Sequence, residues 1–103
     1  MPSVLLIFIK NPVLGKVKTR LARTVGDAEA LRIYLLLLEK TRQAALDARA
    51  ERRLYYSDRI ETEDAWAGAD FKKFVQHGPD LGARMAGAFR QSFADGADRA
   101  VII

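Results

Sequence analysis

Cysteine is absent from the 103-residue sequence, and histidine occurs only once, at position 77. These scarcities exclude a disulfide framework, a cysteine-based zinc site and a multi-histidine metal site within this sequence. Any metal would be held by carboxylates, water and ligand phosphates. Apolar runs are also short: none approaches the ~20 residues of a membrane span, and the N-terminus lacks the basic segment and cleavage site of a signal peptide. These absences predict a cytoplasmic protein with no membrane partner.

Charged residues make up 29% and hydrophobic residues 50% of the sequence, which is typical of a globular fold. The length suits a single domain. The net charge of +4 is unevenly placed, because five basic residues and no acidic residue lie between Lys10 and Arg23. This basic segment favours a small anionic ligand or an anionic polymer as the binding partner.

Short apolar segments alternate with longer segments of helical period along the chain. The predicted strands are residues 4–9, 53–57, 71–76 and 99–103, and the predicted helices are residues 28–49 and 81–94. Each strand-like segment ends at turn-forming or polar residues. This order of elements predicts an α/β fold with a mostly parallel sheet and flanking helices.

Finer features of these elements also have signals in the sequence. Asp27 and Asp80 are each placed to cap a following helix, and short helical turns are expected near residues 19–23 and over residues 61–67. In the last helix the apolar residues at four-residue spacing are expected to face the core. They are Leu81, Met85, Phe89 and Phe93, and Ala88 is expected to fill the same face.

The end of the sequence carries a strand signal, Val101-Ile102-Ile103. A central parallel strand needs neighbours on both sides and covering helices. We therefore expect residues 1–103 to form a single partial α/β domain of a larger protein. The alternative is that copies of the chain pair through this strand as a homo-oligomer.

The first candidate binding segment is the basic loop that follows the first predicted strand. Ligands of open α/β sheets bind beyond the carboxyl ends of the strands, where this loop would lie. Gly15 would let the backbone approach a phosphate, and Lys10, Lys18 and Arg20 could neutralise its charge. The segment has neither the Walker A spacing nor the G-x-G-x-x-G pattern, so its spacing alone is equally compatible with a solvated basic loop.

The second candidate segment follows the third predicted strand and opens the last helix. Gln76 offers a donor and an acceptor to a base edge, Gly78 permits close approach, and Arg84 on the first helical turn could reach a phosphate. The structural alternative is that Gln76 ends a strand and Arg84 lies on the surface. His77, alone in a loop, is expected to be a surface residue.

Together the two segments resemble a bacterial family of GT-A-like glycosyltransferases, which includes arsenosugar-biosynthesis glycosyltransferase-like proteins and was formerly a domain of unknown function. Residues 8–21 match its pattern F-x-K-x-P-x-x-G-x-V-K-T-R-L without a break. Residues 76–85 match a second pattern, Q-x-G-x-D-L-G-x-R-M, which is followed by Ala88-Phe89. The two patterns occur in order, and the resemblance covers essentially the whole chain.

The resemblance implies the N-terminal portion of a nucleotide-diphospho-sugar transferase fold, which is Rossmann-like. It implies a nucleotide-sugar or a nucleotide diphosphate as the ligand. By this resemblance the first loop contacts the diphosphate or its nucleoside, and the second segment contacts the base and the phosphates. The implied nucleotide-binding residues are Lys10, Gly15, Lys18 and Arg20 in the first segment and Gln76, Gly78 and Arg84 in the second.

The resemblance also bears on metal and activity. In the family, the strand that matches residues 100–103 continues into a G-T-D segment whose aspartate is the expected metal ligand. We therefore expect Mg²⁺ or Mn²⁺ in the full-length family member and no metal held by these 103 residues alone. The implied function is a nucleotide-sugar-dependent glycosyltransferase, of which this chain is the nucleotide-binding half and inactive by itself.

Other functions remain open at the level of sequence. One is nucleotidyl transfer to a phosphorylated small molecule, because the family is distantly similar to phospholactate guanylyltransferase. Another is a basic nucleic-acid-binding or self-associating module. Against nucleic acid, the sequence has no known nucleic-acid-binding motif, and no aromatic residues are interleaved with the basic loop. We therefore expect no nucleic-acid partner.

Overall fold

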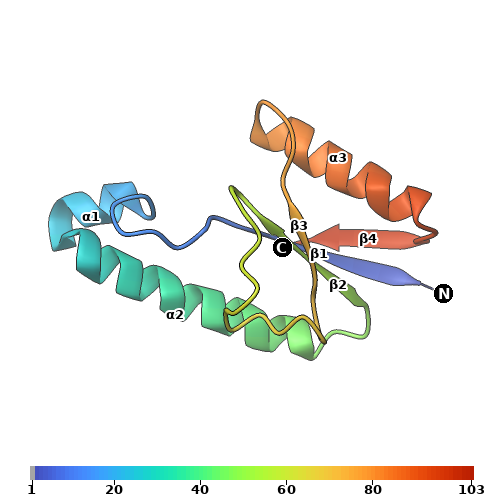
Figure 1. Ribbon diagram of the computed structural model, residues 1–103, viewed down its shortest axis with the longest axis horizontal. Helices are drawn as coiled ribbons and strands as arrows, with labels where there is room; N and C mark the ends of the chain where they lie inside the picture. The colour runs from blue at the N-terminus through green and yellow to red at the C-terminus, as the bar shows by residue number, and fades with distance from the viewer. Residues whose placement is uncertain (1) are drawn as a thin grey trace.

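A four-stranded parallel sheet organises the chain in the computed structural model, which describes residues 2–103 (Figure 1). The strands lie in the order β3-β2-β1-β4, so the first strand is central. Their bounds are β1 Ser3–Ile9, β2 Glu51–Tyr56, β3 Lys72–Val75 and β4 Arg99–Ile102, and those of the helices are α1 Thr19–Val25, α2 Asp27–Leu46 and α3 Leu81–Ala94. The predicted α/β fold with a parallel sheet and flanking helices is confirmed.

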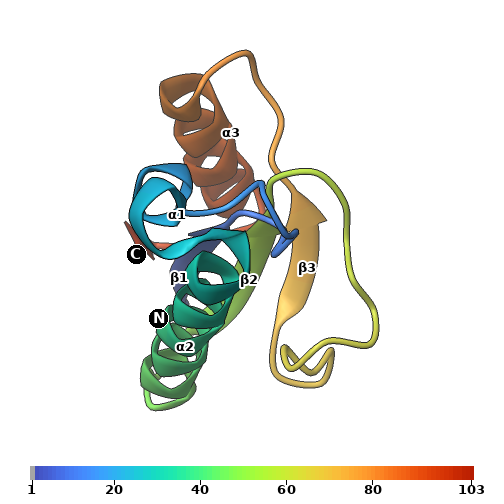
Figure 2. The same ribbon diagram turned by 90° about the vertical axis from the view of Figure 1, so that its left-hand side faces the viewer.

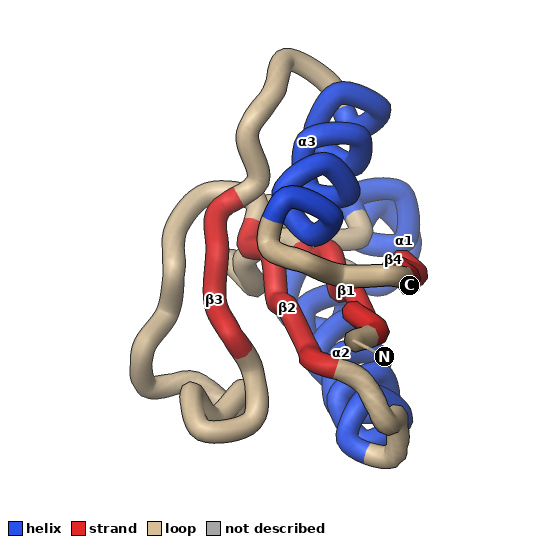
Figure 3. The backbone as a smooth tube through the Cα atoms, turned by 90° about the vertical axis from the view of Figure 1, so that its right-hand side faces the viewer, coloured by secondary structure: helices blue, strands red, loops and turns tan. Residues whose placement is uncertain are grey.

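The sheet is covered on both faces, with α2 on one side and α3 on the other (Figures 1 and 3). Successive residues of a strand point to opposite faces, so β1 contributes Ile7 to the core beneath α2 and Leu6 to the core beneath α3. Both residues are fully buried. This two-sided burial explains why the β1 sequence is an unbroken apolar run. No helix within residues 2–103 is long and apolar enough to cross a membrane.

An irregular connection joins β2 to β3, although parallel strands are usually joined by a helix. It descends beside the edge strand β3 (Figures 2 and 3). Its side chains Trp66 and Phe71 are buried in the core beneath α2, with ring centroids 4.9 Å apart in an edge-to-face arrangement. These two aromatic rings supply apolar contact that a crossover helix would otherwise provide.

The predicted helical turn over residues 61–67 is wrong. Residues 62–66 form a series of bends, because the Asp64 carboxylate is held by long-range partners. It accepts hydrogen bonds from the hydroxyl of Tyr56 and, at 2.9 Å, from the ammonium of Lys73. It also accepts from the backbone N–H of Trp66.

The predicted cap of α2 by Asp27 is also wrong. Gly26 is the N-cap, at φ 89°, and Asp27 is the first residue of the helix. The N–H of Gly26 donates to Ala22 at the end of α1, while its carbonyl accepts from Ala30 in α2. One glycine thus joins the two helices, which pack against each other, and α2 ends at Leu46, three residues before its predicted end.

The predicted core face of α3 is confirmed for Ala88 and is wrong for Leu81 and Phe93. Ala88 and Ser92 are the buried residues of this helix, whereas Leu81 and Phe93 are 60% and 51% exposed. The hydroxyl of Ser92 donates to the Ala88 carbonyl at 2.9 Å, so its burial leaves no unmet donor. Small residues at the contact let α3 lie close to the sheet, and Phe89 packs from the flank.

The C-terminal end of α2 is capped by an arginine from β2. The Nε of Arg52 donates to the carbonyl of Ala45 at 2.7 Å, and its Nη2 donates to the carbonyl of Leu46 at 2.9 Å. Both carbonyls belong to the last turn of the helix, and that of Ala45 also accepts from the backbone N–H of Ala48 at 3.1 Å. The guanidinium also lies 5.9 Å from the centroid of the Phe71 ring. Arg52 therefore joins α2, β2 and the β2–β3 connection.

Replacing Arg52 with Met should lower the free energy of unfolding by about 2 kcal/mol, because hydrogen bonds from a charged donor are lost while the apolar stem is kept. Urea unfolding followed by circular dichroism measures this. Arg49→Met removes an exposed arginine three residues earlier and should leave stability almost unchanged. Equal stability of the two variants would contradict the capping role.

All three tyrosines of the chain are wholly or partly withdrawn from water. Burial raises the pKa of Tyr34, Tyr55 and Tyr56 above the ordinary value, and for Tyr56 the hydrogen bond to the Asp64 carboxylate raises it further. The folded state therefore holds these phenolic protons more tightly than the unfolded chain does.

Stability should consequently fall as the pH rises above about 10, where tyrosines of the unfolded chain ionise and the folded ones do not. For each tyrosine, a pKa that is one unit higher in the folded than in the unfolded state corresponds to about 1.4 kcal/mol of the free energy of unfolding, which is lost at high pH. The ultraviolet absorbance of tyrosinate measures this directly. We expect ionisation at higher pH in the folded protein than in urea, and superimposable titrations would refute the interpretation.

Candidate functional site

The candidate site lies where the parallel strands end. The carboxyl ends of β1, β2 and β3 meet at one edge of the sheet, as in other open α/β sheets. The residues that follow these strands are Lys10, Ser57 and Gln76, and the N-terminus of α3 lies beside them. Both predicted binding segments therefore start at this edge.

Asn11 joins the loop after β1 to the loop after β2. Its side chain is buried, at 3% exposure. Its Oδ1 accepts from the backbone N–H groups of Asp58 and Arg59 at 2.9 and 3.2 Å. Its Nδ2 donates to the carbonyl of Arg59 at 2.9 Å, and its backbone N–H donates to the hydroxyl of Ser57. This one amide fixes the relative position of the two loops.

Gln76 forms a second buried clamp, between β1 and β2. Its Nε2 donates to the carbonyl of Ile9 at 3.1 Å and to the carbonyl of Tyr55 at 3.0 Å. Both amide hydrogens are thus used within the protein. The remaining Oε1 accepts from Nη1 of Arg84 at 3.4 Å. The predicted contact of Gln76 with a base can therefore involve its oxygen but not its amide hydrogens.

The backbone of Lys10 is held by α2. Its N–H donates to the Tyr34 hydroxyl at 2.9 Å, and the same hydroxyl donates to the Lys10 carbonyl at 3.1 Å. Burial of Tyr34 raises the pKa of its phenol, so it remains a neutral donor and acceptor. The Lys10 side chain is exposed. The main chain is therefore fixed while the ammonium group stays available.

The entry to α3 is fixed by Asp80 and Gly78. The Asp80 carboxylate accepts from the N–H of Ala83 at 2.8 Å, which confirms the predicted cap. Gly78 adopts φ 140°, and a Cβ there would lie 3.1 Å from both the Ala83 Cβ and the Arg84 nitrogen. Its carbonyl accepts from Nε of Arg84 at 3.0 Å. Gly78 is therefore required by the turn, which holds Arg84 in place.

These elements enclose a sheet-edge cavity of about 380 Å³. We use this name for the hollow lined by Phe8, Ile9, Lys10, Ser57, Gln76, Asp80, Leu81 and Arg84. Its volume falls within the range of small-molecule sites. Two cationic side chains, an amide oxygen and a hydroxyl line it together with the Asp80 carboxylate, so its side-chain charge is net positive and suits an anionic polar ligand.

Lys18 and Arg20 lie elsewhere. They line a separate hollow of about 500 Å³ between α1 and α2, together with Leu21, Ile33 and Leu37. Figure 1 shows α1 at the far end of the basic loop from the sheet edge. Gly15 adopts φ 79° in the turn of that loop, beside Asp27. The structure thus gathers Lys10, Gln76 and Arg84 in one cavity and places Lys18 and Arg20 in another.

Metal ligands are sparse at both places. Within residues 2–103, no three histidine or carboxylate side chains converge as a cation site.

Comparison with known proteins gives the family. Residues 21–103 match the family described as an uncharacterized protein conserved in bacteria (DUF2064). The chain belongs to this family. Its fold is similar to that of a "putative nucleotide-diphospho-sugar transferase" from Desulfovibrio desulfuricans G20, with a TM-score of 0.89 and 34% identity over 100% of this chain. No curated protein matches the sequence.

The relative is longer than this DUF2064 chain, which spans 47% of its length. The comparison confirms the nucleotide-diphospho-sugar transferase fold that the two sequence patterns predicted. The matched region contains all four strands and three helices described above.

Two residues that shape the candidate site, Asn11 and Tyr34, have no clear signal in the sequence. Asn11 contacts residues 46 to 48 positions away, and Tyr34 contacts Lys10 from 24 positions away. Spacing along the chain does not reveal such contacts. The only signal for Asn11 is its position two residues after a buried strand, at the edge of the sheet where ligands of open α/β folds bind.

Replacing Asn11 with Ala should lower the free energy of unfolding by about 2 kcal/mol or more, because the N–H groups of Asp58 and Arg59 lose their acceptor. Urea unfolding measures the effect. Gln43→Ala deletes an exposed amide on α2 and should cost less than about 0.5 kcal/mol. Similar values for the two variants would show that Asn11 is no clamp.

Proposed function

We propose that this chain binds the nucleotide of a nucleotide-sugar donor and forms the donor-binding half of a glycosyltransferase. The observation that carries the proposal is the convergence of Lys10, Gln76 and Arg84 in the sheet-edge cavity. The name of the structural relative supports the same class of ligand. Sugar transfer itself is proposed for the whole protein, because the chain spans about half of that relative.

Arg84 is the principal phosphate ligand in this proposal. Its Nε–H and one Nη1–H are used by the carbonyl of Gly78 and the amide oxygen of Gln76, which orient the guanidinium. An arginine has five N–H donors, so others remain to meet phosphate oxygens. A guanidinium held in this way loses little rotamer freedom when it binds, which favours affinity.

Lys10 supplies the second charge. Its backbone is fixed by Tyr34, and its flexible side chain reaches the cavity as a mobile point charge. Gly15 and Gly78 both have positive φ angles, so their proposed role is to form the turns of the two binding segments.

Lys18 and Arg20 are proposed to act at longer range. They line the hollow between α1 and α2 and carry no acidic neighbour within the basic loop. Their charges raise the local concentration of an anionic ligand, an effect that salt screens within about 10 Å at 0.1 M. Their replacement should therefore weaken binding mainly at low ionic strength.

Isothermal titration calorimetry with uridine and guanosine diphosphates tests this assignment. Arg84→Met should weaken binding at least tenfold, since loss of charge-assisted hydrogen bonds costs about 1.5–3 kcal/mol. Lys10→Met should weaken it less. Arg90→Met, on an exposed position of the same helix, should bind like the unaltered chain.

Two results would contradict the proposal: no binding of any nucleotide diphosphate, or equal affinity of the Arg84→Met and Arg90→Met variants. The affinities for a nucleotide-sugar and for a nucleoside triphosphate distinguish the glycosyl-transfer proposal from the nucleotidyl-transfer alternative. A donor site for sugar transfer should bind the nucleotide-sugar more tightly.

A further inference from the structure

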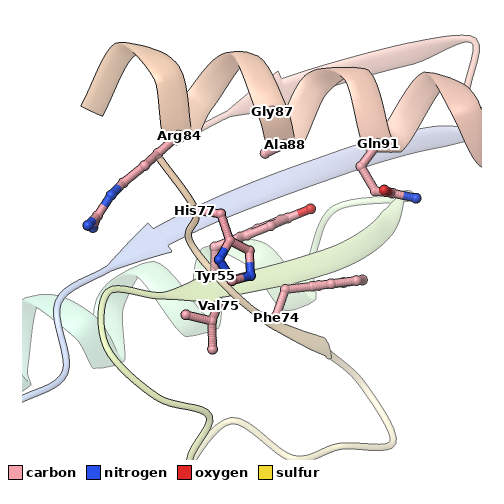
Figure 4. A pocket seen from close by; sticks show the side chains of 8 residues that line it. All are labelled: Tyr55, Phe74, Val75, His77, Arg84, Gly87, Ala88 and Gln91. Carbon is pink, nitrogen blue, oxygen red and sulfur yellow. The ribbon is translucent and has the colours of Figure 1, made fainter. Parts of the chain in front are cut away.

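A second cavity lies between α3 and the edge of the sheet at β3 (Figure 4). We propose that it is a binding site for a single aromatic ring that carries an anionic or hydrogen-bond-accepting substituent. We call it the aromatic cavity and define it by Tyr55, Phe74, His77, Gly87 and Gln91, with Arg84 at its boundary. It adjoins the sheet-edge cavity, with which it shares Arg84, and the proposal does not depend on nucleotide binding.

The wall formed by the sheet is aromatic. The rings of Tyr55 and Phe74 are stacked, with centroids 4.9 Å apart and planes at 15°. Phe8 lies on the other side of Tyr55, with centroids 5.1 Å apart. The faces of the Tyr55 ring are therefore covered, and the Arg53 guanidinium lies 5.3 Å from the centroid of the Phe74 ring. A ligand ring would meet the edges of this aromatic row, an arrangement that aromatic pairs favour. A planar ring is therefore the shape that this wall accommodates best.

The opposite wall is open because of Gly87, which lies in the interior of α3. A glycine at such a position is destabilising relative to alanine. The backbone does not require it here: a Cβ on Gly87 would meet nothing closer than 4.0 Å, and its φ lies outside the left-handed region. The clear structural effect of this glycine is to leave the space beside Tyr55 and Phe74 free.

Size and polarity limit the ligand. The cavity volume is about 250 Å³, whereas a cavity of about 150 Å³ holds benzene. One substituted ring therefore fits, and a complete nucleotide does not. The polar lining consists of His77, Gln91 and Arg84, with no acidic side chain among the residues of the cavity. This lining favours an acceptor or an anion over a cationic substituent.

Arg84 connects the two cavities, since it lines both. In Figure 4 its guanidinium points away from the Tyr55 and Phe74 rings, and the imidazole of His77 lies between α3 and the strands. The ring of a ligand would lie against the two aromatic side chains. Its substituent would meet His77 or Gln91, or extend toward Arg84.

Amide chemical shifts recorded during titration with benzoate test the proposal. We expect saturable shifts at residues 74–77 and 87–91, and binding at least threefold weaker for benzylamine. Gly87→Leu fills the cavity and should abolish these shifts. Ala86→Leu adds the same side chain on the exposed side of the same helix and should retain them.

Gly87→Ala serves as a second variant if the leucine disturbs folding. Its added methyl fits, so the fold should be kept and the melting temperature raised, while affinity for benzoate falls severalfold. Absence of benzoate-dependent shifts in the unaltered chain would overturn the proposal. So would retention of binding in Gly87→Leu, or binding of benzylamine as tight as that of benzoate.

Discussion

The carboxyl ends of the strands are held together by two buried side-chain amides. Gln76 donates to carbonyls at the ends of β1 and β2, and Asn11 joins the loops that follow the same strands. Backbone groups that leave a sheet need partners when they are buried. Each amide supplies donors and acceptors at once, so the loops around the cavity are fixed in place without a bound ligand.

This constraint explains how a small chain can present a defined binding site. Gln76 orients Arg84 through its remaining oxygen, Asp80 fixes the start of α3, and Tyr34 holds the backbone of Lys10. Preorganised groups lose little freedom on binding, which favours affinity and specificity. Lys18, in contrast, lies in the hollow between α1 and α2, away from the clamps. The cationic residues at the sheet edge, Lys10 and Arg84, therefore have a different proposed role from Lys18 and Arg20.

The sequence predicted the elements whose signals are local. The apolar run of β1, the Asp80 cap and the four strands are each determined by neighbouring residues. One wrong prediction concerns contacts beyond the immediate neighbours: Asp64 is held by Tyr56 and Lys73, eight and nine residues away, instead of lying on a helical turn. For the same reason the clamp formed by Asn11 was missed. Another wrong prediction is local, because Gly26 and not Asp27 is the N-cap of α2. On α3 the buried residues are Ala88, which was predicted to face the core, and Ser92, whose polar side chain gives no apolar signal.

The most direct test of the account is a map of the nucleotide site by backbone amide chemical shifts during titration with uridine or guanosine diphosphate. The account predicts that the largest shifts fall on residues 10–11, 57–59 and 76–84, where the clamped strand ends meet α3. Shifts confined to residues 16–37, around α1 and α2, would contradict it. They would place the ligand on the basic loop instead of at the sheet edge.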